Sequence, residues 1–446
     1  MDHDDPAGRS VPRTPVCPFG ASYPARPHQT LDELRESCPV ARVRTAAGRP
    51  VWLVTAGALV RAGFTDPRLA MRSRPPATGD DQQRALAVTV VDHDGPHHAR
   101  LRRLAAPSLT PHRVAAFRPT VERTATRLLT ALDGASQIDL MADFAHRFAF
   151  EAFCDLLGIE RAAWTDLFGW VARVFHPAGR GGKDRSNVDR IERFMTAEVD
   201  RRLRQPGNDV MSAIVTAGQA DREVSKKELV SLCAALLLGS FETTPQMLGI
   251  SVVTLLTHPD QLAWLRADLS RVSVALDELL RFNSPGPSGT PRVATEDIRL
   301  GETVIPAGDR VLLSIDGANH DPADHGDPHR LDLRRPSASR HLSFGLGPHF
   351  CPGSSLARME LTVALTALLR RYPRMALATP VEELPWRGSH LNRGLAALPL
   401  DTGEPASVTP GRKGWTDRRT EVATGARTGD GRVTGGAANL GLDGSP

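Results

Sequence analysis

The stretch HLSFGLGPHFCPGSSLARMEL, from His341 to Leu361, places one cysteine in a loop of glycines and prolines that leads directly into a helical sequence. Cys351 is one of five cysteines, which are far apart along the chain and form no C-x-x-C pair. This distribution argues against a disulfide framework and against a structural zinc site. The role of Cys351 therefore has to be inferred from the residues of the loop that contains it.

Three roles are open to Cys351 from its surroundings alone. It can be a structural thiol, which is the commonest fate of a lone cysteine. It can be a nucleophile served by His349 or His341, although no nucleophile motif surrounds it. It can be a metal ligand; zinc would need three or four ligands at suitable spacing, whereas haem iron needs a single proximal thiolate. The helix that starts at Ser354 would stabilise a thiolate, and the glycines allow a flat macrocycle to approach the backbone.

The segment FGLGPHFCPG resembles the cysteine-ligand loop of the cytochrome P450 family, the haem-thiolate monooxygenases, with the pattern F-G-x-G-x-H-x-C-x-G. The fixed positions of that pattern are all present, as Phe344, Gly345, Gly347, His349, Cys351 and Gly353. The resemblance implies that Cys351 is the iron ligand of haem b, iron protoporphyrin IX. It also implies cofactor-binding positions at Phe344, Gly345 and Gly353. The similarity continues in the family's order from about residue 15 to about residue 400.

Two more motifs support the resemblance. LDELLRF contains Glu278 and Arg281, which match the family's E-x-x-R and share one face of a helix at their i,i+3 spacing. In the family this pair is structural and locks to an arginine of a later loop, and Arg335 in LDLRRP resembles that arginine. The segment ANHDP, residues 318–322, matches the family's A-N-x-D-P.

Haem carries two propionates, so the resemblance also implies basic residues that bind them. His98 and Arg102 in DGPHHARLRR lie at i,i+4 and point the same way from a helix. Arg292 and His349 match two further propionate-binding positions. Each of the four would be an ordinary solvated basic residue if it stood alone, and their order along the chain is what favours the haem interpretation.

The longest predicted helix runs from Ser225 to His258, with capping-box spacing between Ser225 and Glu228. Its apolar sequence places it in the core. The segment GSFETTPQM interrupts that pattern, because Pro245 cannot donate to the carbonyl of Phe241. The sequence therefore predicts a local opening of this helix.

This interrupted segment resembles the family's oxygen-binding helix, with the pattern A/G-G-x-D/E-T. Glu242 and Thr243 match the acid–alcohol pair that delivers protons to bound dioxygen, and Thr244 is the alternative alcohol. Ser240 stands where the family usually has glycine. A hydroxyl group there would add a hydrogen bond or narrow the space over the iron.

Four regions are expected to form the substrate pocket: the loop 71–91, the oxygen-binding helix, the segment PGPSGTP and the turn near residue 391. The small side chains of PGPSGTP suggest a roomy wall and a bulky polyketide, terpenoid or peptide substrate. The candidate wall residues are Leu236, Gly239, Phe241, Pro287, Ser288, Gly289, Thr290 and Leu391.

Composition and charge limit the classes of partner and the location that the sequence allows. The net charge is +4 over 446 residues and the arginines are scattered, so nothing suggests nucleic-acid binding. No apolar run has the length of a membrane span, and the N-terminal sequence lacks the apolar core of a signal peptide. We therefore expect a cytoplasmic protein. The expected fold is mainly α with small β-sheets, arranged as a flexible segment 1–27, one catalytic domain 28–402 and a disordered tail 403–446.

The resemblance implies a monooxygenase that uses O2 and two electrons to hydroxylate or epoxidise a small, secondary-metabolite type of substrate. Similarity to the bacterial members without a membrane anchor implies electrons from NAD(P)H through a separate ferredoxin and its reductase. Two alternatives remain: oxidative coupling or ring formation without oxygen insertion, and a non-enzymatic haem or ligand binder.

Overall fold

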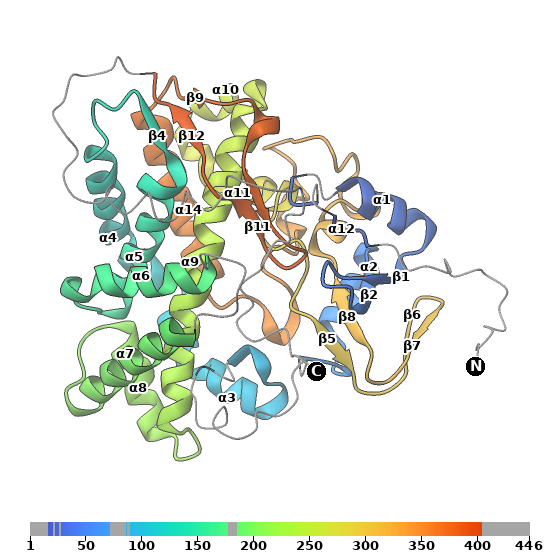
Figure 1. Ribbon diagram of the computed structural model, residues 1–446, viewed down its shortest axis with the longest axis horizontal. Coiled ribbons are helices and arrows are strands. Elements are labelled where there is room, and N and C mark those ends of the chain that lie inside the picture. Colours follow the sequence, from blue (N-terminus) through green and yellow to red (C-terminus); the bar gives the residue numbers. More distant parts are fainter. Residues whose placement is uncertain are drawn as a thin grey trace.

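The computed structural model describes residues 17–20, 23–25, 28–71, 86, 90–176 and 185–403. Helices fill one side of the molecule, and a sheet that contains β1, β2 and β8 lies at the other side (Figure 1). The expected fold, mainly α with small sheets, is confirmed. The predictions for residues 1–16, for most of the loop 71–91 and for the tail 404–446 lie outside the described residues.

Helices make up most of the regular structure in the described residues. The helices have these bounds: α1 (His28–Ser37), α2 (Gly57–Thr65), α3 (Gly95–Ala105), α4 (Pro111–Thr130), α5 (His146–Leu157), α6 (Trp164–Phe175), α7 (Arg185–Arg204), α8 (Val210–Ala220), α9 (Lys226–Leu256), α10 (Pro259–Arg266), α11 (Val272–Phe282), α12 (Ile315–Asn319), α13 (Pro322–His325) and α14 (Ser354–Arg371). A π-helical turn, η4 (Leu140–Ala145), leads into α5.

The largest sheet has five strands in the order β1-β2-β8-β5-β3. Its strands are β1 (Val40–Arg44), β2 (Pro50–Val54), β3 (Leu69–Ala70), β5 (Arg292–Ala294) and β8 (Arg310–Leu313). β2 runs parallel to β8, with Trp52 opposite Val311. The smaller sheets are formed by β4 (Gln137–Asp139), β12 (Pro399–Asp401) and β9 (Ala376–Leu377), by β6 (Ile298–Leu300) and β7 (Thr303–Ile305), and by β10 (Trp386–Gly388) and β11 (Arg393–Leu395).

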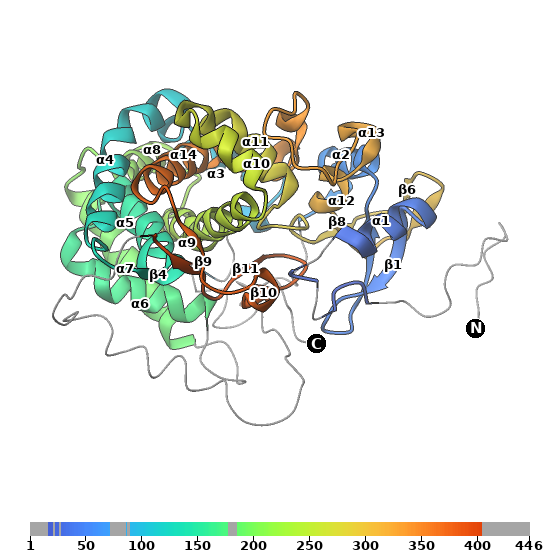
Figure 2. The same ribbon diagram turned by 90° about the horizontal axis from the view of Figure 1, so that it is seen from above.

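Helix α9 passes through the core, between the other helices and the β10–β11 hairpin (Figures 1 and 2). Its predicted capping box is present, because Ser225 and Glu228 bond each other's backbone N–H groups. The predicted local opening is wrong: α9 is continuous although Pro245 lies inside it. Pro245 has no N–H to donate to the carbonyl of Phe241. That carbonyl instead accepts a hydrogen bond from the side chain of His146.

The E-x-x-R pair of α11 lies in a fully enclosed network. Arg281 donates to both carboxylate oxygens of Glu278 at 2.7 and 2.8 Å, and both side chains have no exposed surface. Arg335 donates to the same carboxylate at 3.1 Å, as the family resemblance implied. Because two guanidinium groups and the backbone N–H of Asp332 all donate to one carboxylate, the network fixes α11 against the loop that carries Arg335.

Asn319, from the ANHDP segment, connects this network to the cysteine loop. Its carbonyl accepts from Arg281 at 2.8 Å, and its side chain binds the backbone N–H of Leu342 at 2.7 Å and the hydroxyl of Ser343 at 3.0 Å. Ser343 in turn donates to the carbonyl of Leu280 at 2.7 Å. The start of the cysteine loop is therefore held on the end of α11.

Part of the N-terminal segment that the sequence predicted to be flexible is packed on the domain. Phe19 and Tyr23 are buried in a cluster with Leu31 and the β1–β2 hairpin. Their aromatic rings supply enough apolar area to hold this stretch in place. Within the described ranges, no helix is long and apolar enough to cross a membrane.

Candidate functional site

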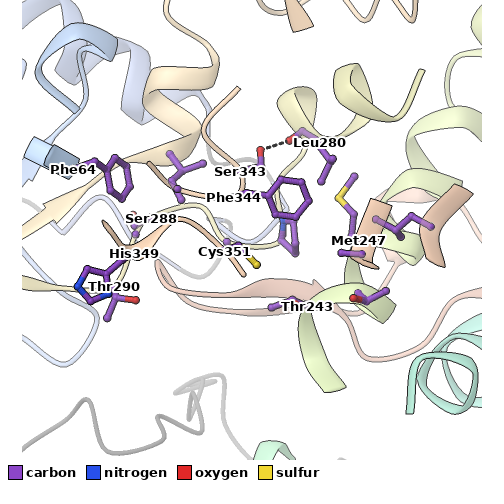
Figure 3. Close-up of a pocket in the computed structure, with 18 of the residues that line it drawn as sticks. Phe64, Thr243, Met247, Leu280, Ser288, Thr290, Ser343, Phe344, His349 and Cys351 are labelled. Carbon is purple, nitrogen blue, oxygen red and sulfur yellow. Dashed lines mark hydrogen bonds between the residues drawn. The ribbon is translucent and has the colours of Figure 1, made fainter. Parts of the chain in front are cut away.

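A cavity of about 260 Å³ lies between α9 and the cysteine loop, residues 344–353. Figure 3 shows Thr243 and Met247 of α9 at one end, Cys351 in the middle, and His349 with Thr290 at the other end. Most of the remaining wall is apolar or small. It consists of Phe64, Met71, Thr244, Leu280, Pro285, Gly286, Ser288, Gly289, Arg292, Ile315, Ser343, Phe344, Gly345, Ala357 and Leu361.

The cysteine loop is a tight turn that glycine makes possible. Gly345 and Gly347 have φ values of 71° and 75°, a region that side chains with a Cβ rarely adopt. A Cβ on Gly347 would also lie 2.9 Å from the carbonyl oxygen of Phe64. The turn closes where the N–H of Cys351 donates to the carbonyl of Phe344 at 2.9 Å. As a result, the sulfur of Cys351 lines the cavity just before α14 begins.

Burial raises the pKa of Cys351, and two groups oppose that shift. The backbone N–H of Gly353 and the positive charge of Arg102 both favour the thiolate, but they do not outweigh the loss of hydration. The prediction that the start of α14 stabilises a thiolate is therefore met only in part. A coordinated cation would supply the missing stabilisation, because metal ligation deprotonates a thiol.

Arg292 is the basic residue most closely associated with the cavity. It is buried, it lines the cavity from β5, and its Nη1 donates to the carbonyl of Leu69 at 3.0 Å. Its Nε is buried and has no hydrogen-bond partner among the described residues. Burial lowers the pKa of Arg292. An unpaired buried guanidinium nitrogen at a cavity wall fits a carboxylate ligand such as a haem propionate.

The other three predicted propionate-binding residues divide into two groups. The ring of His349 stacks on that of His98 at 4.0 Å, and its Nε2 lies 3.1 Å from Asp94. Burial lowers the pKa of both imidazoles, to about 4 for His98, so at neutral pH they are hydrogen-bonding groups without charge. Arg102 donates to the carbonyl of Phe350 at 2.7 Å and does not line the cavity. The structure thus places Arg102 on the cysteine loop.

These features together fit an iron porphyrin. The site offers one sulfur donor, a glycine surface at Gly345 next to the ring of Phe64, and an apolar wall. The unpaired Nε of Arg292 and the imidazoles of His98 and His349 offer donors to carboxylates. The cysteine therefore has surroundings that suit a haem ligand better than a catalytic nucleophile, for which the described residues supply no oriented base.

The proposed oxygen-binding residues of α9 face different ways. Thr243 lines the cavity, and its hydroxyl donates to the carbonyl of Gly239 at 2.9 Å. Thr244 also lines the cavity, whereas Ser240 does not, because its hydroxyl turns back to the carbonyl of Leu237 at 2.9 Å. The substitution of the usual glycine by Ser240 therefore leaves the cavity unobstructed.

Glu242 lies outside the cavity, on the side of α9 that faces β10. Its carboxylate lies 3.3 Å from Nε2 of His176 and 3.1 Å from Nη2 of Arg387. Burial alone would raise the pKa of Glu242, but the hydrogen bond and charge of His176 and the charge of Arg387 outweigh it, so its pKa is lowered. Glu242 is thus an ionised carboxylate one residue from the cavity wall.

The residues expected to form the substrate wall divide into those that line the cavity and those that do not. Ser288, Gly289 and Thr290 line the cavity. The candidates that do not line it are Leu236, Gly239, Phe241, Pro287 and Leu391. The ring of Phe241 instead packs among the aromatic rings of α5 and α6, since helical periodicity turns its side chain away from that of Thr243.

Several wall residues were missed from the sequence. Met247 lies four residues after Thr243, so helical spacing could have identified it. Phe64 and the Asp94 partner of His349 come from segments far away in the sequence. No spacing rule connects such residues, and only the folded chain brings them together.

Comparison with known proteins agrees with this site. A profile of the family described as "Cytochrome P450" matches residues 149–377. The chain is 35% identical over 387 residues to 6-deoxyerythronolide B hydroxylase of Saccharopolyspora erythraea, covering 84% of this chain and 95% of that protein. The ligand-free P450 monooxygenase TamI superposes with a TM-score of 0.80 at 35% identity, covering 88% of this chain and 95% of that one. The P450 enzyme CxnD, for C–S bond formation in chuangxinmycin biosynthesis, superposes with a TM-score of 0.79 at 30% identity, covering 89% and 98%.

Proposed function

This chain belongs to the cytochrome P450 family of monooxygenases, and we propose that it hydroxylates or epoxidises a bulky secondary metabolite. The observation that carries the proposal is the cavity itself. It joins the sulfur of Cys351 and the hydroxyl of Thr243 to a wall of small residues that includes Gly286 and Gly289. The name of the relative 6-deoxyerythronolide B hydroxylase supports a substrate of that size class.

Cys351 is the proposed iron ligand, and Arg292, His98 and His349 are the proposed partners of the haem propionates. Bound haem supplies the redox chemistry that activates O2, and a thiolate ligand increases its electron density. Arg102 acts indirectly, because its hydrogen bond to the carbonyl of Phe350 fixes the residue before Cys351. The loop glycines keep this part of the wall free of side chains.

Thr243 and Glu242 are the proposed proton-delivery pair. Thr243 presents its hydroxyl at the cavity wall, and Glu242 holds an ionisable carboxylate at the adjacent position on the far side of α9. Because neighbouring positions on a helix point about 100° apart, a proton taken up at Glu242 needs a bridging water or a side-chain movement to reach Thr243. Thr244 is the alternative alcohol, since it lines the same cavity.

The electrons are proposed to come from NAD(P)H through a separate ferredoxin and ferredoxin reductase. The support is the similarity to bacterial P450 enzymes such as 6-deoxyerythronolide B hydroxylase. Reconstitution with a heterologous ferredoxin and reductase tests this pairing directly.

Oxidative coupling is the second candidate, and one comparison favours it. CxnD, whose name assigns it to C–S bond formation, has a TM-score and coverage close to those of the monooxygenase TamI. Turnover under ¹⁸O₂ separates the two functions. A hydroxylase or epoxidase places one labelled oxygen atom in the product, whereas a coupling enzyme leaves the product unlabelled.

The experiment that tests the whole proposal is spectroscopic. The reduced, CO-bound protein should absorb at the position typical of thiolate ligation, and Cys351→Ser should lose that band. Natural-product scaffolds should then be screened for a low-to-high-spin Soret shift, and the best binders assayed for product. A protein that binds ligands tightly but forms no product with any ferredoxin would be a non-enzymatic haem protein, contrary to the proposal.

A further inference from the structure

A second group of potential ligands lies on the opposite side of α9 from the cavity. His146 begins α5, His176 follows the last residue of α6, and Glu242 belongs to α9. One donor atom from each of these three residues lies within 4.8 Å of the others. Two imidazoles and one carboxylate form a donor set that first-row transition metals, zinc above all, bind well.

Two of these donors are buried without a hydrogen-bond partner in the described part of the chain. They are Oε2 of Glu242 and Nδ1 of His146. Gln246 and Arg387 both donate to Oε1 of Glu242, whereas Oε2 has an ion-pair contact with Nε2 of His176, at 3.3 Å, and no donor from the rest of the described chain. Buried polar atoms are nearly always satisfied, and two that converge on one point indicate a ligand between them.

The backbone of α9 supplies a supporting contact. Pro245 leaves the carbonyl of Phe241 without its helical donor, and the imidazole of His146 takes that donor's place. Metal-bound histidines typically use their second nitrogen in this way, to a carbonyl or a carboxylate, which fixes the ring orientation.

Arg387 is the group that opposes metal binding. Its guanidinium contacts both His176 and Glu242, and it occupies the space that a cation would need. Its own Nε has no hydrogen-bond partner among the described residues, and its side chain is 29% exposed. Arg387 lies on the short β10–β11 hairpin, from which a long side chain can swing outward to solvent.

We propose that His146, His176 and Glu242 form a binding site for a divalent transition metal such as Zn²⁺, in competition with the guanidinium of Arg387. Metal and arginine are alternative cations for the same carboxylate. If Glu242 also supplies protons, a consequence that rests on the proposed function, the bound ion would withdraw Glu242 from that role.

Calorimetric titration of the haem-loaded protein with ZnCl₂ tests the proposal. The protein should carry no polyhistidine tag and should first be treated with EDTA and dialysed. We expect one ion per chain, with imidazole nitrogen and carboxylate oxygen in the X-ray absorption spectrum at the zinc edge. Because binding is measured without turnover, failure of the metal site and failure of the proposed function give different results.

Matched variants assign the ligands. His176→Ala should weaken binding by ~10-fold or more, as should Glu242→Gln, because each removes one donor. Arg387→Gln should tighten binding by a similar factor, since it removes the competing charge. His97→Ala is the control: His97 also contacts a glutamate, with its Nε2 2.9 Å from Glu228, but no third donor from the described residues completes a group with them. This variant should bind zinc as the wild type does.

Two results would overturn the proposal. One is zinc binding to the wild type and to Arg387→Gln that is no tighter than to His176→Ala. The other is binding that His97→Ala removes and His176→Ala leaves intact. His176 lies at a helix end and is partly exposed, so its replacement should fold even if a variant of the buried His146 does not.

Discussion

Two carboxylates of this protein, Glu278 on α11 and Glu242 on α9, face arginines in otherwise similar ways but differ in how completely they are paired. Glu278 receives four hydrogen bonds, from Arg281, Arg335 and the N–H of Asp332, and has no exposed surface. Glu242 receives two hydrogen bonds on one oxygen, and its other oxygen has only the longer contact with Nε2 of His176, at 3.3 Å, among the described residues.

The difference distinguishes a carboxylate that stabilises the fold, Glu278, from one that can take part in chemistry, Glu242. A buried charge that is fully paired gains nothing from moving, so the Glu278 network can only hold its neighbours in place. The second oxygen of Glu242, which has only the longer contact with His176 in the described chain, leaves the carboxylate able to accept a proton or a cation. The Glu278 network therefore holds the cysteine loop in place. Glu242 can instead affect the chemistry in the cavity on the other side of α9.

The strongest test of this contrast is Glu278→Gln. The variant leaves the buried charges of Arg281 and Arg335 uncompensated, which typically costs ~3–5 kcal/mol. We expect little soluble protein and no retained haem, measured by thermal unfolding and by the Soret band. Glu122→Gln is the control, because Glu122 is exposed and forms an i,i+4 ion pair with Arg118 on the surface, so it should behave as the wild type. A stable, haem-loaded Glu278→Gln protein would contradict the supporting role.

Glu242→Gln should show the opposite behaviour. The amide keeps the shape of the side chain, and Arg387 is exposed enough to find water, so the midpoint of thermal unfolding should change little. Product formation should fall by ~100-fold, which is the usual contribution of a positioned acid–base group. The measurement is turnover with a saturating substrate and a full redox system. An unfolded variant, or an unchanged rate, would show that the two carboxylates do not differ as argued.

Thr243→Ala extends the contrast to the cavity side of α9. Thr243 lines the cavity, whereas Glu242 lies outside it, so loss of the Thr243 hydroxyl should uncouple electron use from product and release hydrogen peroxide. We expect several-fold lower coupling, measured as product formed per NAD(P)H consumed. Thr244→Ala is the matched comparison, because Thr244 lines the same cavity. If only Thr244→Ala uncoupled the reaction, Thr244 and not Thr243 would be the alcohol that delivers protons.

The network around Glu278 could be predicted from the sequence, whereas the surroundings of Glu242 could be predicted only in part. Glu278, Arg281 and the Cys351 loop belong to motifs with fixed spacing, so a resemblance identifies both the residues and their partner Arg335. Short-range geometry carries most of that information, because the pair lies on one helix face and the loop is a single turn.

The surroundings of Glu242 depend on long-range contacts instead. His176 lies 66 residues before Glu242, and Arg387 lies 145 residues after it. Neither residue belongs to a motif that could be recognised in the sequence. The break predicted at Pro245 was wrong for the same reason, since His146 replaces the missing donor from another helix. The proline could be read from the sequence, whereas the group that compensates for it could not.

The smallest effect in this series is the pH dependence of stability that Glu242 adds. Its pKa in the folded protein is lowered below the ordinary value of 4.5 because His176 and Arg387, with His146 nearby, favour the ionised form over the opposing effect of burial. A lowered folded pKa means that the contribution is fully present above pH 4.5 and is lost as the pH falls through the folded value. Denaturant unfolding of the wild type and Glu242→Gln should therefore differ by ~1 kcal/mol at pH 7 and converge in acid. A difference that grew on acidification would mean that Glu242 destabilises the folded state, and the partly paired carboxylate would then be held under strain by the rest of the cluster.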